Sequence, residues 1–175
     1  MRDDELLRRM AAGDADAAEA LVARYYDEIL RYCLWHAPMQ ALAEDAAQEV
    51  FLKFIRYAPR AARHGQLRAL LYQIARHTCI DMARRHYLSD APLEIAPEIA
   101  AMDAGFAESQ SQAALREMVA RLPDTQREIV LLRFAQDLTL REIASVTGLP
   151  LRTVQSRLRA ALKTLRKDYE KGDFS

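Results

Sequence analysis

The stretch TLREIASVTGLPLRTVQSRLRAALKTLRK, residues 139–167, predicts two helices joined by a short turn. Thr139 and Glu142 have the spacing of a capping box, in which each side chain binds the other residue's backbone N–H where a helix starts. Gly148 ends the first helix, and Pro150 restricts the backbone where the second begins. This arrangement is typical of a helix-turn-helix, a motif that binds duplex DNA.

The second of these helices has an apolar and a polar face at helical spacing. Its aliphatic residues share a stripe that we expect to pack inward: Val154, Leu158, Ala161, Leu162 and Leu165. The remaining surface carries side chains of the kinds that bind phosphates or read base edges: Arg152, Thr153, Gln155, Ser156, Arg159, Lys163 and Arg166. Duplex DNA is therefore the expected partner. The alternative interpretation is a helical hairpin that binds no DNA and exposes its basic face to solvent.

The charges of the chain are segregated although its formal net charge is zero. Residues 1–52 carry 5 basic and 11 acidic side chains, and residues 53–86 carry 8 and 1. Residues 87–124 carry 2 basic and 7 acidic side chains, and residues 139–171 carry 8 and 3. The basic blocks coincide with strongly predicted helices, which favours nucleic-acid binding at two places.

Composition predicts a small and mainly helical protein. The chain has only 5 glycines and 6 prolines, and in long stretches its apolar residues recur at helical spacing. Its 175 residues are enough for one domain or two small ones. The N-terminus lacks an apolar signal core, and no run approaches the roughly 20 apolar residues that span a bilayer. We expect a cytoplasmic protein without membrane insertion.

The sequence shows no pattern typical of a metal site or a catalytic site. Cys33 and Cys79 fall inside helical patterns, where they suit buried free thiols, and neither forms a four-ligand metal pattern with His36 or His77. No paired carboxylates and no nucleophile with a base converge. We expect no metal, no cofactor, no catalytic residue and no small-molecule substrate.

Residues 14–36, 42–57 and 67–86 show amphipathic periodicity and predict three helices around one core. Side chains expected inward include Val50, Phe54 and Ile55, and on the third helix Leu67, Leu70, Leu71, Ile74, Thr78 and Met82. An outward stripe on the second helix surrounds a leucine with acidic and amide side chains: Asp45, Gln48, Glu49 and Leu52, with Lys53 beside them. Plain solvent exposure and a protein partner are both open interpretations of this stripe.

A basic loop, YAPRAARHGQ at residues 57–66, separates the second and third of these helices. The third helix also carries cationic side chains outside its apolar stripe: Arg68, Arg76, His77, Arg84 and Arg85.

Four blocks in this order and spacing resemble an extracytoplasmic-function sigma factor of bacterial RNA polymerase: AEDAAQEVFLKF, LRALLYQIARHTCIDMARR, LPDTQREIVLLRF and TLREIASVTGLPLRTVQSRL. The resemblance covers nearly the whole chain. It implies an all-α fold of two small helical domains, residues 1–87 and 112–171. A flexible acidic linker, residues 88–111, would join them, and the second domain would contain the helix-turn-helix.

The resemblance also implies what each surface binds. Core RNA polymerase would be gripped through its clamp by the stripe Asp45, Gln48, Glu49 and Leu52, which we call the clamp-facing stripe. The melted minus-10 strand of promoter DNA would be held by Tyr57, Arg60, Arg63, His64, Arg76, His77, Arg84 and Arg85. The minus-35 duplex would be read by Arg152, Thr153, Gln155, Ser156, Arg159 and Lys163. An anti-sigma factor is a further expected partner.

The sequence departs from the family pattern at several positions. Leu70 and His77 stand where tryptophan and asparagine are usual, and Ala160 and Leu162 stand where arginines are common. Because Ala160 and Leu162 lack the arginine charge, the family's contacts with upstream promoter DNA transfer less well to this chain. Arg159 and Lys163, which lie nearby, partly compensate. The alternatives from other classes are a stand-alone helix-turn-helix repressor and, less favoured, a nucleic-acid-modifying enzyme.

Overall fold

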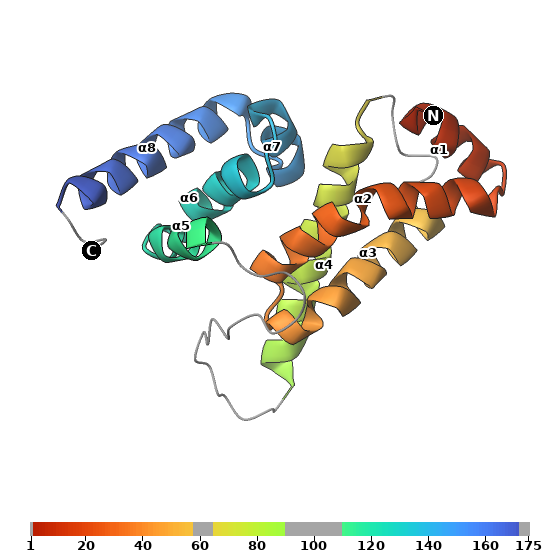
Figure 1. The fold of residues 1–175 in the computed structure, drawn as a ribbon, viewed down its shortest axis with the longest axis horizontal. Coiled ribbons are helices and arrows are strands. Elements are labelled where there is room, and N and C mark those ends of the chain that lie inside the picture. The colour runs from red at the N-terminus through yellow and green to blue at the C-terminus, as the bar shows by residue number, and fades with distance from the viewer. Residues whose placement is uncertain (1, 58–64, 90–109, 172–175) are drawn as a thin grey trace. The chain divides into compact units, whose positions relative to one another are not determined.

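The computed structural model describes residues 2–57, 65–89 and 110–171. Their regular structure is helical throughout, with no strand, which confirms the all-α prediction (Figure 1). The chain divides into two compact units, residues 1–94 and 95–175, which are described separately. Most of the predicted linker, residues 90–109, lies outside the described residues. Within the described part of the chain, no helix is long and apolar enough to cross a membrane.

Unit 1 contains α1 (Asp3–Ala11), α2 (Ala15–His36), the short η1 (Gln40–Leu42), α3 (Ala43–Tyr57) and α4 (Leu67–Leu88). Asp14 starts α2, since its carboxylate accepts the backbone N–H groups of Asp16 and Ala17 at 3.0 and 3.3 Å. The same carboxylate accepts a hydrogen bond from Arg9 at 2.7 Å. This bond and the backbone donors hold the pKa of Asp14 below its ordinary value. Asp14 therefore joins the end of α1 to the start of α2.

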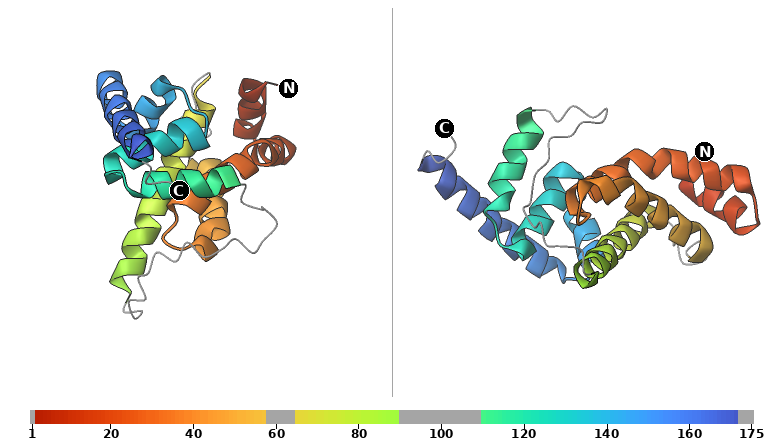
Figure 2. Two further views of the ribbon diagram at one scale, coloured as in Figure 1. Left: turned by 60° about the vertical axis from the view of Figure 1, so that its left-hand side comes forward. Right: turned by 90° about the horizontal axis from the view of Figure 1, so that it is seen from below.

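The core of unit 1 lies among α2, α3 and α4, which pack on one another, with α4 crossing the other two helices in Figures 1 and 2. Tyr32 of α2, Phe54 of α3 and Tyr72 of α4 are fully buried there. The rings of Tyr32 and Tyr72 meet edge to face, with centroids 5.5 Å apart. These large side chains hold the three helices together, so the outer faces of α3 and α4 are presented on a packed support.

Two predictions about the core of unit 1 need correction. Ile55, expected inward, is 41% exposed, because α3 buries Val50, Phe51 and Phe54 and leaves the side of Ile55 uncovered. On α4, Leu70, Ile74 and Met82 are only half-buried. The buried residues of α4 form a broader face, because this helix packs on both α2 and α3: Leu67, Ala69, Leu71, Tyr72, Ala75, Thr78 and Cys79.

Unit 2 contains α5 (Gln110–Ala120), α6 (Asp124–Val130), a π-helical turn η2 (Leu131–Ala135), α7 (Leu140–Thr147) and α8 (Leu151–Glu170). The capping box is confirmed, since Thr139 Oγ1 accepts the Glu142 N–H at 3.2 Å. In return, the Thr139 N–H donates to Glu142 Oε2 at 2.7 Å. Gly148 has a φ of +71°, the left-handed conformation that ends a helix, and Pro150 directly precedes α8. The turn between α7 and α8 is therefore set by local chemistry.

The inward stripe of α8 is narrower than predicted. Val154, Ala161 and Leu165 are buried and Leu158 is half-buried, but Leu162 is 42% exposed. The prediction for Leu162 was wrong because α8, which packs on α6 and α7, buries only Val154, Ala161 and Leu165. This narrow seam leaves most of the surface of α8 open.

Candidate functional site

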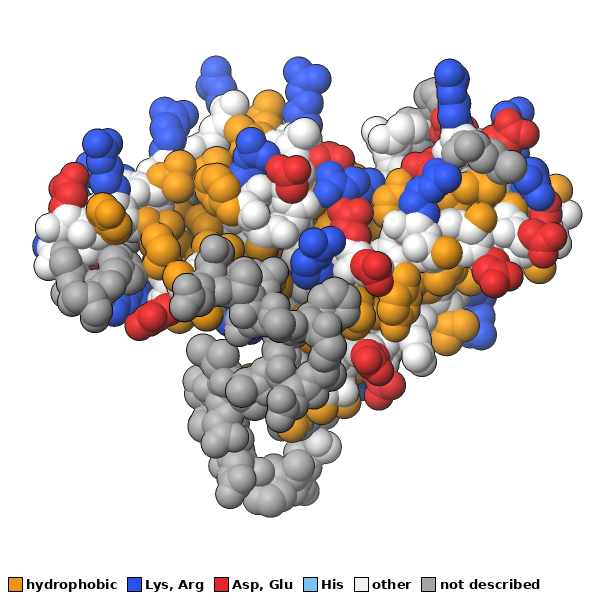
Figure 3. Space-filling view, viewed as in Figure 1, with side chains coloured by type: hydrophobic (Ala, Val, Ile, Leu, Met, Phe, Trp, Pro, Cys, Tyr) orange, Lys and Arg blue, Asp and Glu red, His pale blue; other side chains and the backbone are white. Residues whose placement is uncertain are grey.

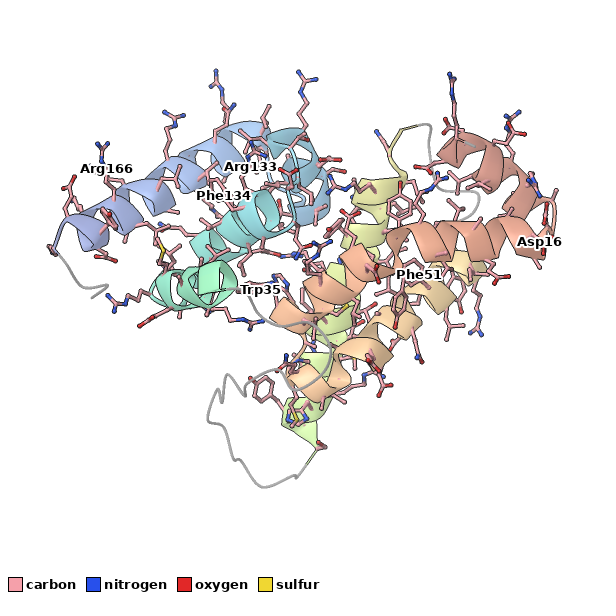
Figure 4. All side chains as sticks on the ribbon, in the orientation of Figure 1. Asp16, Trp35, Phe51, Arg133, Phe134 and Arg166 are labelled. Carbon is pink, nitrogen blue, oxygen red and sulfur yellow. The ribbon has the colours of Figure 1, made fainter. Side chains whose placement is uncertain are left out.

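The outer surface of α8 is strongly basic. Arg152, Ser156, Arg159 and Lys163 are exposed, while Thr153 and Gln155 are half-buried at its first turns. Figure 3 shows Lys and Arg side chains standing out from this helix, and Figure 4 shows Arg166 pointing away from unit 2. The structure thus brings the predicted duplex-binding residues onto one helix at the surface.

The cations of α8 differ in whether acids neutralise them. Arg166 lies 3.6 Å from Glu170, one turn further along the helix. Among the residues that the structure describes, Arg152, Arg159 and Lys163 make no ion pair. Their charge is therefore available to phosphate oxygens or to acceptor atoms on base edges.

The clamp-facing stripe lies on the outer side of α3. Asp45 and Gln48 are exposed, Leu52 is 61% exposed, and Glu49 is half-buried. Ile55, also exposed, extends the apolar surface beside Leu52. A leucine and an isoleucine within an acidic face suit a partner that has both apolar and basic groups.

The cations predicted to hold a melted strand lie mainly on the outer face of α4. His77, Arg84 and Arg85 are exposed and Arg76 is half-buried. Tyr57, at the end of α3, is 72% exposed, and the Arg56 guanidinium lies 5.9 Å from its ring centroid. The predicted residues Arg60, Arg63 and His64 lie outside the described residues.

Arg68 has a structural partner that its outward placement in the sequence did not indicate. Its Nε lies 2.6 Å from Glu28 Oε1, which also accepts the Tyr72 hydroxyl at 2.8 Å. This carboxylate ties the first turn of α4 to α2. The partners are 40 residues apart, so no local sequence signal pointed to the contact.

Glu49 connects the clamp-facing stripe to the cations of α4. Its carboxylate lies 2.9 Å from Lys53 Nζ and 3.4 Å from Arg85 Nη2. Partial burial would raise the pKa of Glu49, but the hydrogen bonds and charges of Lys53 and Arg85 outweigh that effect and lower it. The carboxylate is therefore ionised at neutral pH and shared between two cations.

The sulfur atoms of Cys33 and Cys79 lie 4.0 Å apart in the core of unit 1. Both cysteines are free and buried, as predicted. The contact with Cys79, together with burial, raises the pKa of the Cys33 thiol. In the described ranges, no three His, Cys, Asp or Glu side chains are grouped to hold a metal ion.

The chain matches known protein families and known proteins over most of its length. Residues 21–88 match the family model of Sigma-70 region 2, and residues 112–165 match that of Sigma-70, region 4. The ECF RNA polymerase sigma factor ShbA of Streptomyces griseus is 34% identical over 186 residues, covering 95% of this chain and 97% of that protein. This chain belongs to the extracytoplasmic-function sigma factors. The sigma factor directs transcription initiation, and a stand-alone repressor is not favoured.

Other relatives also match the sigma factor over most of both chains. ECF RNA polymerase sigma factor SigD of Mycobacterium tuberculosis is 31% identical over 185 residues, covering 99% of this chain and 87% of that protein. RNA polymerase sigma factor YlaC of Bacillus subtilis is 29% identical over 163 residues, covering 89% of this chain and 94% of that protein. A solved structure of CnrH in complex with the cytosolic domain of CnrY has a TM-score of 0.71 at 20% identity and covers 97% of both chains. That last likeness concerns the fold.

Proposed function

We propose that α8 of this sigma factor reads the minus-35 promoter element from the major groove. The observation that carries the proposal is that Arg152, Arg159 and Lys163 are exposed and make no ion pair within the described part of the chain. An arginine binds the guanine edge through two hydrogen bonds, whereas a lysine neutralises phosphates as a point charge. Thr153, Gln155 and Ser156 would add contacts from the first turns of the helix.

The clamp-facing stripe, Asp45, Gln48, Glu49 and Leu52, is proposed to bind core RNA polymerase. The exposed Leu52 would supply buried apolar area, and the two carboxylates would select a basic partner surface. Because these side chains lie outside the core of unit 1, their replacement should remove binding without unfolding α3.

The melted minus-10 strand is proposed to lie along α4 and the loop before it. Arg76, His77, Arg84 and Arg85 would hold its phosphates. An unpaired base would be held by stacking and hydrogen bonds from Tyr57, Arg60, Arg63 and His64. The exposure of Tyr57 supports this role, because a stacking ring needs an open face.

Two further properties belong to the same proposal. An anti-sigma factor would hold the protein inactive by covering its polymerase-binding surfaces. The protein would act in the cytoplasm, where bacterial transcription takes place, and would contribute binding and strand capture with no enzymatic activity of its own.

The experiment that tests the proposal is reconstitution. Purified full-length protein is added to core polymerase on fragmented genomic DNA, and the 5′ ends of the transcripts are sequenced. We expect protein-dependent 5′ ends downstream of shared minus-35 and minus-10 sequences. Their absence would reject the proposed function.

Variants assign the surfaces when co-purification with core polymerase is measured beside the transcription assay. The double variant Glu49→Arg and Leu52→Asp should lose co-purification with core polymerase while its helix content stays unchanged. Arg152→Ala with Arg159→Ala should keep co-purification and lose initiation at promoters that depend on the minus-35 element. The opposite pattern would mean that the surfaces have been assigned to the wrong partners.

A further inference from the structure

Glu49 lies between the two surfaces proposed for unit 1. It belongs to the clamp-facing stripe of α3, yet its carboxylate contacts Arg85, one of the strand-binding cations of α4. Glu49 Oε2 lies 3.4 Å from Arg85 Nη2, and Oε1 lies 3.5 Å from the same nitrogen. A cation proposed for DNA is thus paired, in the free protein, with an acid proposed for polymerase.

The two cations around Glu49 are held with different firmness. Lys53 Nζ lies 2.9 Å from Glu49 and also donates to the buried Thr78 hydroxyl at 3.2 Å. Its side chain is 34% exposed, whereas that of Arg85 is 64% exposed and its contact with Glu49 is longer. Lys53 is therefore a fixed partner of Glu49, and Arg85 is the partner that is easily displaced.

We infer that Glu49 is a positioning residue that restrains Arg85 in the free protein, and that a basic group of the polymerase bound to the same carboxylate releases Arg85 to a strand phosphate. The inference rests on the roles proposed for the clamp-facing stripe and α4. The partner group is basic because Asp45 and Glu49 make the stripe acidic. Polymerase binding and strand binding are then coupled through one side chain.

The chemistry favours such an exchange. An exposed ion pair is weak and screened by salt, so Arg85 leaves Glu49 at little cost. A guanidinium then gains charge-assisted hydrogen bonds to phosphate oxygens. Glu49 keeps Lys53 and gains the polymerase cation, so its half-buried carboxylate is never left without a partner.

The test measures binding of a short, fluorescein-labelled oligothymidine to the full-length protein at low salt, without polymerase. Oligothymidine reports phosphate contacts independently of promoter sequence. We expect Glu49→Gln to raise the affinity about two- to fivefold, the range of a released surface ion pair. Glu44→Gln is the matched control, since it removes the same charge from an exposed position on the same helix.

The Arg85→Ala background separates release of Arg85 from general electrostatics. The gain from Glu49→Gln should disappear there, and in the wild-type background it should shrink as salt rises. A gain no larger than that of Glu44→Gln, or an equal gain without Arg85, would overturn the inference. Circular dichroism verifies that each variant keeps its helices.

Co-purification with core polymerase distinguishes failure of the inference from failure of the proposed function. Weakened co-purification of Glu49→Gln, together with the Arg85-dependent gain, supports both. Full co-purification with that gain overturns the release step and the clamp role of Glu49. Weakened co-purification without the gain overturns only the restraint of Arg85.

Discussion

Arg127 on α6 ties the end of α5 to the rest of unit 2, and we expect Arg127→Met to destabilise that unit. Its guanidinium donates to the carbonyl oxygens of Val119, Ala120 and Leu122 at 3.0, 3.1 and 2.9 Å. These carbonyls lie at and just beyond the end of α5, where helical donors run out. Hydrogen bonds to a charged group contribute about 1.5–3 kcal/mol each, so three would contribute at least about 4.5 kcal/mol. The side chain is 37% exposed, so water replaces part of this, and we expect a net loss of about 2 kcal/mol.

The assay uses the separate location of the single tryptophan. Trp35 lies on α2 (Figure 4), so its fluorescence reports unfolding of unit 1, whereas far-UV circular dichroism reports both units. With an m value of about 1 kcal/mol/M in urea, the dichroism midpoint of unit 2 should fall by about 2 M. Arg141→Met, at an exposed position of α7, is the control and should shift it little. A shift below about 0.5 M in Arg127→Met, or an equal shift in Trp35 fluorescence, would refute the reasoning.

Three further predictions follow from single contacts. Thr139→Ala removes the capping box and should cost unit 2 about 1 kcal/mol in urea unfolding, whereas Thr139→Ser should retain most of that stability. Arg159→Ala and Gln155→Ala should each lose about 1–3 kcal/mol at promoters with a good minus-35 element, measured by competitive transcription, while Lys163→Ala should weaken all promoters alike; equal losses for all three would show that α8 only grips the backbone. Because the folded-state pKa of Glu49 is lowered from 4.5, its ionised form stabilises the protein above that value, and the contribution is lost as pH falls through the folded pKa. Wild type and Glu49→Gln should therefore differ in unfolding midpoint at neutral pH and converge in acid, and a constant difference would contradict this.

The bounds of α7 and the start of α8 followed from local rules. Thr139, Glu142, Gly148 and Pro150 predicted the ends of α7 and the start of α8, and the structure has them in those roles. Such signals are readable because a cap involves side chains and backbone groups only a few residues apart. The order of the sequence blocks likewise indicated the family that the comparisons show.

Burial was predicted less well. Periodicity assigns a side chain to a face of a helix, but it does not say how much of that face a neighbouring helix covers. Ile55 and Leu162 have apolar spacing and remain exposed, because the helices packed on α3 and α8 cover a narrower part of each surface than the spacing suggests. On α4 the opposite error also occurred, since contact with two helices buries Ala69, Tyr72 and Ala75 outside the predicted stripe.

By itself, the sequence determined that the chain is helical, where α7 ends and α8 begins, which residue types α8 exposes, and which family the chain resembles. Only the tertiary structure decided which charges meet. Glu49 and Arg85 are 36 residues apart, and Glu28 and Arg68 are 40 apart. Such contacts depend on where helices cross and which rotamers their side chains adopt. Packing among Tyr32, Phe54 and Tyr72 sets those crossings, and no local pattern encodes them.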